Sequence, residues 1–212
     1  MSSDTLLVVR GEFSMEDPWA IPPSCNPVRL RRAIDGAPPR LSTTVSAYHD
    51  DEFVTVVFSS ADDHIVATLF AHDEPLYEED VVEVFLSPAD RGEYYELEVN
   101  PVGTTFDARI ESPHGVRSSM RADVDWDCEG LLAAVRKMVE PRNLMTIDTV
   151  VRVPFESLRA APPRNGDSWR GNFFRIDRHP SEGDEYSAWR PTLKTPVDFH
   201  VVASFGRLLF QS

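Results

Sequence analysis

The clearest pattern in the chain is an alternation of apolar and polar positions between residues 75 and 110. Apolar side chains recur at alternate positions over residues 81–86 and 94–100, and residues 104–110 form a third run. A period of two is the signature of a half-buried β-strand. Residues 87–93, with Pro88, Asp90 and Gly92, and residues 101–103 supply turn-forming residues between the runs. We therefore predict an antiparallel meander of three strands.

The alternation also predicts how these strands pair. If their apolar rows share one face, Val84 lies opposite Leu97 and Glu83 lies opposite Glu98. The same reasoning across the second turn places Glu98 opposite Asp107, so that Glu83, Glu98 and Asp107 form a row across three strands. Like charges directly opposite one another destabilise a sheet. We therefore expect water, an arginine, a cation or a ligand beside this row, the alternative being a simple solvated sheet face.

The rest of the chain extends the same pattern into an all-β fold. Short strands are predicted at residues 6–9, 43–48, 53–58, 64–70, 131–139, 146–153, 169–177 and 207–210, although residues 131–139 also suit a helix. Residues 10–40 are irregular and rich in proline, with Trp19 as an anchor, and residues 178–205 form a long loop. Many short strands separated by Gly/Pro turns indicate an antiparallel β-sandwich. We predict one domain over residues 1–212, with residues 1–40 as an irregular N-terminal wrap.

Charge narrows the classes of partner. The 212 residues carry 35 Asp and Glu against 21 Lys and Arg, a net charge of -14. Nucleic acids and anionic membranes both need a basic surface, so neither is expected as a partner. The first residues have neither a basic start nor an apolar core, and no apolar run approaches the ~20 residues of a membrane span. The expected location is the cytoplasm, unless a leader has been removed.

Metal and redox chemistry have weak signals. Cys25 and Cys128 lack zinc-ligand spacing, and we expect two isolated thiols rather than a disulfide. The acidic loop at residues 73–80 offers oxygen ligands for calcium but has no EF-hand pattern, so a solvated charge run is favoured. Scattered histidines suit surface or capping roles better than catalysis; they are His64, His72, His114, His179 and His200.

Two functional hypotheses use the acidic meander. Glu83 and Glu98 could act as the paired carboxylates of a glycoside hydrolase, which lie about 5–5.5 Å apart in retaining enzymes. Alternatively, aromatic side chains in loops and polar groups on strands could form a saccharide site, since such sites combine apolar walls with a few placed hydrogen-bonding groups. The residues proposed for this site are Tyr77, Glu83, Glu98, Arg175, Trp189 and Phe199.

Several motifs, in order, resemble a family 9 carbohydrate-binding module. They are Pro-Leu-Tyr-Glu-Glu-Asp-Val-Val-Glu-Val-Phe-Leu-Ser-Pro from residue 75, Tyr-Tyr-Glu-Leu-Glu-Val-Asn from residue 94, Gly-Asn-Phe-Phe-Arg-Ile from residue 171, and Trp-Arg-Pro from residue 189 with Phe-Gly-Arg-Leu-Leu-Phe from residue 205. The resemblance covers most of residues 40–212. It implies a β-sandwich of jelly-roll or immunoglobulin-like type that binds sugars without catalysis. Modules of this family are often appended to xylanases, so the resemblance points to xylan as ligand and to polysaccharide catabolism. It also implies that structural calcium can be present and that no cofactor is required.

The resemblance also implies roles for particular residues. The family type grips the end of a glycan between two aromatic side chains, which fall here at Tyr77 and at Phe199 or Trp189. Its carboxylate falls at Glu83. An arginine of the type falls near Glu98, where this chain has an acid, and Arg175 is expected to supply the positive charge by facing Glu83 and Glu98. A structural or partner-binding domain with a decayed sugar site is the remaining alternative.

Overall fold

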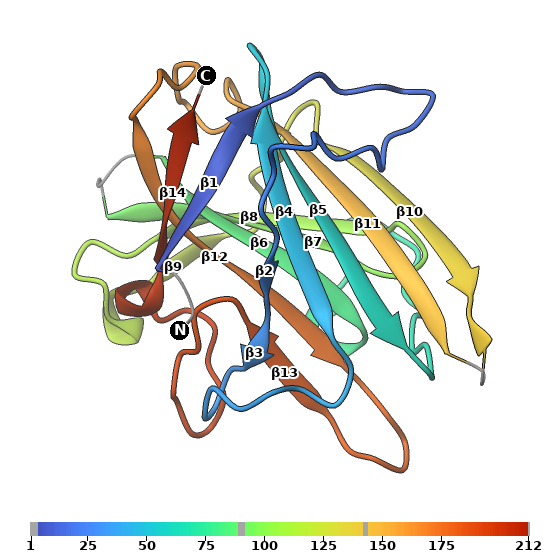
Figure 1. Cartoon of the computed structure of the whole chain (residues 1–212). Helices are drawn as coiled ribbons and strands as arrows, with labels where there is room; N and C mark the ends of the chain where they lie inside the picture. The colour runs from blue at the N-terminus through green and yellow to red at the C-terminus, as the bar shows by residue number, and fades with distance from the viewer. Residues whose placement is uncertain (1–3, 89–91, 142–143, 212) are drawn as a thin grey trace.

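Almost all regular structure in the chain is β-strand (Figure 1), as a computed structural model describes it over residues 4–88, 92–141 and 144–211. The strands are β1 (Thr5–Arg10), β2 (Val28–Arg29), β3 (Arg31–Arg32), β4 (Thr43–His49), β5 (Phe53–Asp62), β6 (Val81–Ser87), β7 (Glu93–Val99), β8 (Thr105–Glu111), β9 (Arg121–Asp123), β10 (Leu132–Val139), β11 (Met145–Pro154), β12 (Ser168–Asp177), β13 (Glu185–Ala188) and β14 (Gly206–Gln211). Short 3-10 turns are η1 (Leu76–Glu78), η2 (Arg117–Ser119) and η4 (Val202–Ser204). No helix in the described part of the chain is long and apolar enough to span a membrane.

The strands form two layers that cross in the view of Figure 1. Hydrogen bonding follows the order β10-β11-β5-β4-β1-β14-β12-β6-β7-β8-β9. Strand β1 pairs in parallel with β14 and, through Val9 and Arg10, with β4, so it joins the two layers. The remaining ladders are antiparallel among the described strands. The predicted all-β sandwich is confirmed, with β1 as the parallel exception.

The main core lies between the layers. Alternate side chains of β4, β5 and β11 meet alternate side chains of β6, β7 and β12, and fully buried members include Phe58, Val84, Leu97 and Phe173. The hydrophobic gain from burying such side chains is about 1.5–3 kcal/mol each. This packing fixes which residues of β6, β7 and β12 point inward and which point outward.

Both outer faces are also covered. On the outer face of β4, β5 and β11, Tyr48 and Val150 pack under the N-terminal segment, where Trp19 takes the anchoring position that the sequence suggested. On the outer face of β6, β7, β8 and β12, a second cluster forms around Phe85 and Phe174 beneath loops from residues 69–80 and 197–205. The acidic face of the meander is therefore buried rather than solvated.

The register between β6 and β7 is as predicted, whereas the register between β7 and β8 is shifted by one residue from the prediction. Glu83 lies opposite Glu98 and Val84 opposite Leu97, but Glu98 lies opposite Phe106. The turn after β7 has a tighter register than expected because the Asn100 side chain accepts hydrogen bonds from the N–H groups of Val102 and Thr104. Asp107 consequently points to the opposite face, and the predicted row of Glu83, Glu98 and Asp107 is wrong.

Other secondary-structure predictions had mixed outcomes. Residues 131–139 do contain a strand, β10, and the predicted hairpin of β4 and β5 is present with β5 extending to Asp62. Residues 64–70 form no strand. The long loop at residues 178–205 contains β13. Asp90, which was expected in a turn, lies outside the described residues.

Both cysteines, Cys25 and Cys128, are free, as predicted.

Candidate functional site

A cleft of about 480 Å³ opens on the outer face of the second layer. Its floor consists of outward-pointing side chains of β6, β7 and β8, including Glu83, Glu96 and Phe106. Tyr77 stands at one wall, on η1, and Phe199 at another, in the loop before η4. Because strand pairing sets Glu83 and the β7 carboxylates on one face, the register of the meander builds the polar floor directly.

Three buried carboxyl groups meet at this floor. Oxygens of Glu83, Glu96 and Glu98 lie within 4.8 Å of one another. Their residues are 2%, 7% and 0% exposed, and Glu98 does not belong to the set that lines the cleft. Neither oxygen of Glu98 has a hydrogen bond of normal geometry in the described structure. Burying polar groups in this way is costly unless they share protons or gain a partner.

Burial keeps this trio largely protonated. Desolvation raises the pKa of Glu83 and of Glu98 well above the usual range, and neighbouring carboxylates raise both further. Desolvation also raises the pKa of Glu96 to about 7, although the close approach of the Glu98 carboxyl favours the ionised form of Glu96. Near neutral pH, the floor therefore offers carboxylic acid O–H donors beside carbonyl and carboxylate acceptors.

The positive charge that acts on Glu83 belongs to Arg178, not to Arg175. Arg175 pairs with Val82 on β6 and points into the sandwich, where it forms an ion pair of 2.7 Å with Asp62. The expectation that Arg175 faces Glu83 and Glu98 is therefore wrong. Arg178 lies beyond the end of β12, and its charge lowers the pKa of Glu83 against the effect of burial.

Arg178 also holds the wall that carries Tyr77. Its Nη2 donates to the backbone oxygen of Tyr77 at 2.7 Å, and its Nη1 donates to the hydroxyl of Tyr186 at 2.6 Å and to Asp184 at 2.5 Å. The sequence analysis missed this residue. Alternation along β12 would have found it, since Phe174 and residues 176 and 178 share the parity of the cleft face while Arg175 does not.

The aromatic groups at the cleft have different surroundings. Tyr77 is 48% exposed and meets Phe106 edge to face, with ring centroids 6.3 Å apart. Phe199 is 7% exposed and stacks on Phe174 at 4.2 Å. Trp189 is fully buried in the main core against Phe173, so it is not a wall of the cleft. Tyr77, Glu83 and Phe199 thus surround one cavity, as expected, and Trp189 does not join them.

A polar rim completes the cleft. His200 accepts or donates at 2.7 Å with the Tyr94 hydroxyl, and burial lowers the pKa of His200 to about 4, so its ring is neutral. Arg117 and Asp198 form an ion pair of 2.8 Å at the mouth. These groups can donate and accept hydrogen bonds to an uncharged polar ligand without adding net charge.

Comparison with known proteins decides the family. The model of carbohydrate-binding family 9 matches residues 39–210. The chain belongs to carbohydrate-binding family 9. The family 9 match includes every element that forms the cleft, from η1 to η4.

Solved structures of similar fold superpose over nearly the whole chain. A candidate carbohydrate-binding protein from Bacteroides uniformis ATCC 8492 has a TM-score of 0.74 at 16% identity, with 98% of this chain and 99% of that chain covered. A family 9 module from Caldicellulosiruptor kristjanssonii has TM-scores of 0.64 in complex with cellotriose and 0.65 in complex with glucose, each at 14% identity, covering 98% of this chain and 94% and 96% of those chains. No curated protein sequence matches the chain significantly.

The carboxylates of the acidic loop at residues 73–80, considered in the sequence as oxygen ligands for calcium or as a solvated charge run, bind backbone instead. Carboxylates of Glu74, Glu79 and Asp80 accept hydrogen bonds from backbone N–H groups of residues 66–71 instead of converging on one point. These bonds replace the strand pairing that residues 64–70 were predicted to have. Calcium binding therefore stays a prediction without a site in this loop.

Proposed function

We propose that the cleft binds the end of a neutral saccharide, with Tyr77 and Phe199 as apolar walls and Glu83 and Glu96 as hydrogen-bonding groups. Membership of carbohydrate-binding family 9 makes carbohydrate binding the function of the chain. The observation that carries the finer proposal is the meeting of Tyr77, Phe199 and two buried carboxyl groups around one cleft of about 480 Å³.

The chemistry of this floor suits hydroxyl groups. A protonated carboxyl both donates and accepts a hydrogen bond, as does each hydroxyl of a pyranose ring. Charged partners such as Arg178 lie close enough to strengthen these bonds without entering the cleft as a free cation. The exposed Tyr77 ring supplies a flat apolar surface of the kind that the C–H face of a sugar covers.

Calorimetric titration with glucose, cellotriose and xylotriose tests the proposal. The Caldicellulosiruptor kristjanssonii module was solved with cellotriose and with glucose, and xylan is the polymer that the resemblance suggested. We expect one binding site per chain. Affinity should not increase further once the oligosaccharide is longer than the number of sugar units that the cleft encloses. Cellotriose reduced to the alditol should bind differently from its methyl glycoside if the reducing end is the end that is gripped.

Variants identify the walls. Tyr77→Ala and Phe199→Ala should each weaken binding by about 10–100-fold, the equivalent of about 1.5–3 kcal/mol for burying one large side chain. Phe70→Ala is the matched control, since Phe70 is 72% exposed on the same loop as Tyr77 and does not line the cleft. An equal loss with Phe70→Ala, or no heat with any of the sugars, would contradict the proposed site.

The geometry gives less support to hydrolysis by Glu83 and Glu98. Glu98 is fully buried and does not line the cleft, and both residues hold their protons because their pKa values are raised. A retaining pair needs one ionised carboxylate beside the substrate. Release of reducing sugar that disappears in Glu83→Gln would favour the hydrolytic alternative.

A further inference from the structure

A second cleft, of about 460 Å³, lies beside the saccharide cleft and shares a wall with it. Tyr186 of β13 and Val197 of the following loop line both clefts. Beyond this common wall, the second cleft is lined by Ile34, after β3, and by residues 182–185, where the turn after β12 enters β13. The two shared side chains therefore form the boundary over which one cleft meets the other.

Pairing between β3 and β13 builds the second cleft. The two strands lie side by side (Figure 1), with Arg32 opposite Ser187. The backbone N–H of Ala33 donates to the backbone oxygen of Tyr186 at 2.7 Å. Ile34 is the next residue along the chain, so this pairing brings it to the same cleft as Tyr186. The second cleft is thus fixed by backbone hydrogen bonds and does not depend on loop side chains alone.

Tyr186 is a rigid, partly exposed wall between the two clefts. Its hydroxyl accepts a hydrogen bond from Arg178 Nη1 at 2.6 Å, and the guanidinium lies over the ring at 5.2 Å from the centroid. The ring also meets Phe199 edge to face at 6.1 Å. A tyrosine hydroxyl that accepts one hydrogen bond still has its own proton to donate. The side chain therefore offers an apolar surface and a placed donor to a ligand that crosses it.

The charges that line the second cleft do not favour an anionic ligand. Three acids, Glu182, Asp184 and Glu185, outnumber the two arginines, Arg32 and Arg40. A phosphate, a sulfate or an acidic sugar would meet a field of its own sign there. A neutral ligand meets no such field.

Salt bridges and hydrogen bonds within the chain already hold the arginines of the second cleft. Arg40 forms two side-chain contacts with Asp63, at 2.5 and 2.9 Å, and its backbone N–H donates to Glu185 at 2.9 Å. Arg32 pairs with Asp35 at 3.1 Å. Fixed polar groups of this kind, beside apolar side chains, suit a ligand with many hydroxyl groups.

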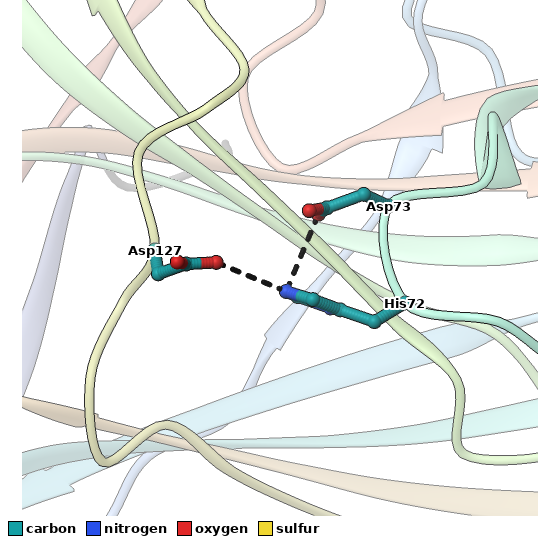
Figure 2. Close-up of side chains that lie close together, drawn as sticks. All are labelled: His72, Asp73 and Asp127. Atoms are coloured by element: carbon teal, nitrogen blue, oxygen red, sulfur yellow. Dashed lines mark ion pairs between the residues drawn. The ribbon is translucent and has the colours of Figure 1, made fainter.

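The loop that leads to Tyr77, on the wall of the saccharide cleft, is tied to its surroundings. Figure 2 shows that His72 points toward Asp73 and toward Asp127 of the loop after β9, with its Nε2 3.4 Å and 3.5 Å from their Oδ1 atoms. Nδ1 of His72 lies 2.9 Å from the backbone oxygen of Thr105 on β8. The Tyr77 wall is therefore held in place, whereas the Tyr186 wall continues into a second cavity.

We propose that the two clefts form one groove for an oligosaccharide, in which the end of the chain occupies the first cleft and the following units cross Tyr186 and Val197 into the second. This inference rests on the proposed saccharide site in the first cleft. The first cleft alone predicts that affinity stops rising once a short oligosaccharide fills it. The second cleft moves this limit to longer chains.

Calorimetry with glucose, cellohexaose and xylohexaose tests the groove in the wild type and in Ile34→Ala. Ile34 lines the second cleft but not the first. Its truncation should weaken binding of the better hexasaccharide by about tenfold, through lost apolar contact, and leave glucose affinity unchanged. Ile21→Ala is the matched control, since Ile21 is 41% exposed and lines neither cleft, and it should leave both affinities unchanged.

The methyl resonances of Ile34 give a second readout that does not depend on the variant. They should shift when a hexasaccharide is added and stay in place when glucose is added. Glucose binding with Ile34 resonances unmoved by either hexasaccharide, or equal hexasaccharide affinity in Ile34→Ala and the wild type, would overturn the groove and leave the proposed site in the first cleft intact. No binding of any of these sugars would overturn both.

Discussion

Replacing Glu96 by glutamine should remove a large part of the pH dependence of folding stability. Burial raises the pKa of Glu96 from 4.5 to about 7, so its ionisation costs about 3 kcal/mol more in the folded than in the unfolded chain. Below about pH 4.5, both states carry the proton and this cost is absent. As pH rises toward 7, the unfolded chain loses the proton first, and the free energy of unfolding falls. The buried trio therefore makes the protein less stable at pH 8 than at pH 5.

Urea unfolding of the wild type and of Glu96→Gln at pH 5, 6, 7 and 8 measures this effect. Over this range, the free energy of unfolding of the wild type should fall by about 3 kcal/mol more than that of the variant. Most of this difference should appear between pH 5 and pH 7. Glu93→Gln, a matched change of charge on the same strand but outside the trio, should keep the wild-type slope. Parallel curves for the wild type and Glu96→Gln would refute the reasoning, because they would mean that Glu96 ionises as easily in the folded state as in the unfolded state.

Three further substitutions separate structural residues from those of the cleft. Arg175→Met should reduce the free energy of unfolding by about 3–5 kcal/mol, since it leaves Asp62 buried without its ion pair, and thermal unfolding should show this while sugar affinity in the folded protein is retained. Trp189→Phe should cost about 2 kcal/mol of stability through lost core packing, yet leave saccharide affinity within twofold of the wild type by calorimetry. Gly206→Ala should cost about 1–3 kcal/mol, because an added Cβ would lie 2.3 Å from the Trp189 ring, and an unchanged melting temperature would contradict that packing.

Sequence alternation was enough to predict the fold class and most strands, because each layer hides one regular row of apolar side chains in the main core. The failures occurred where an outer face is covered as well. The assumption that Glu98 and its neighbours form a half-solvated face led to the wrong partner, Asp107 instead of Phe106. Residues 64–70 also alternate, but their backbone N–H groups are bound by carboxylates of the following loop, a pairing that no local periodicity can reveal.

The candidate site was predictable only in part for the same reason. Tyr77 and Glu83 follow from local motifs, and their meeting follows from strand register and the position of η1. The resemblance placed the second aromatic wall at Phe199 and kept Trp189 as the alternative, since both are aromatic residues in the long loop. Only tertiary packing separates them: Gly206 makes room for the Trp189 ring in the core, whereas Phe199 stacks beside the cleft.

The pairing of β1 with β14 has a consequence for the time course of folding. Leu6 lies beside Leu208, so this ladder closes a loop that contains nearly the entire sequence. Contacts of such long sequence separation form slowly, because the entropy of the intervening chain opposes them. During synthesis, β1 emerges well before β14 and cannot form this ladder until β14 has been translated. The two layers can therefore be locked together only late, and until then the exposed edges of β1 are open to pairing with other chains.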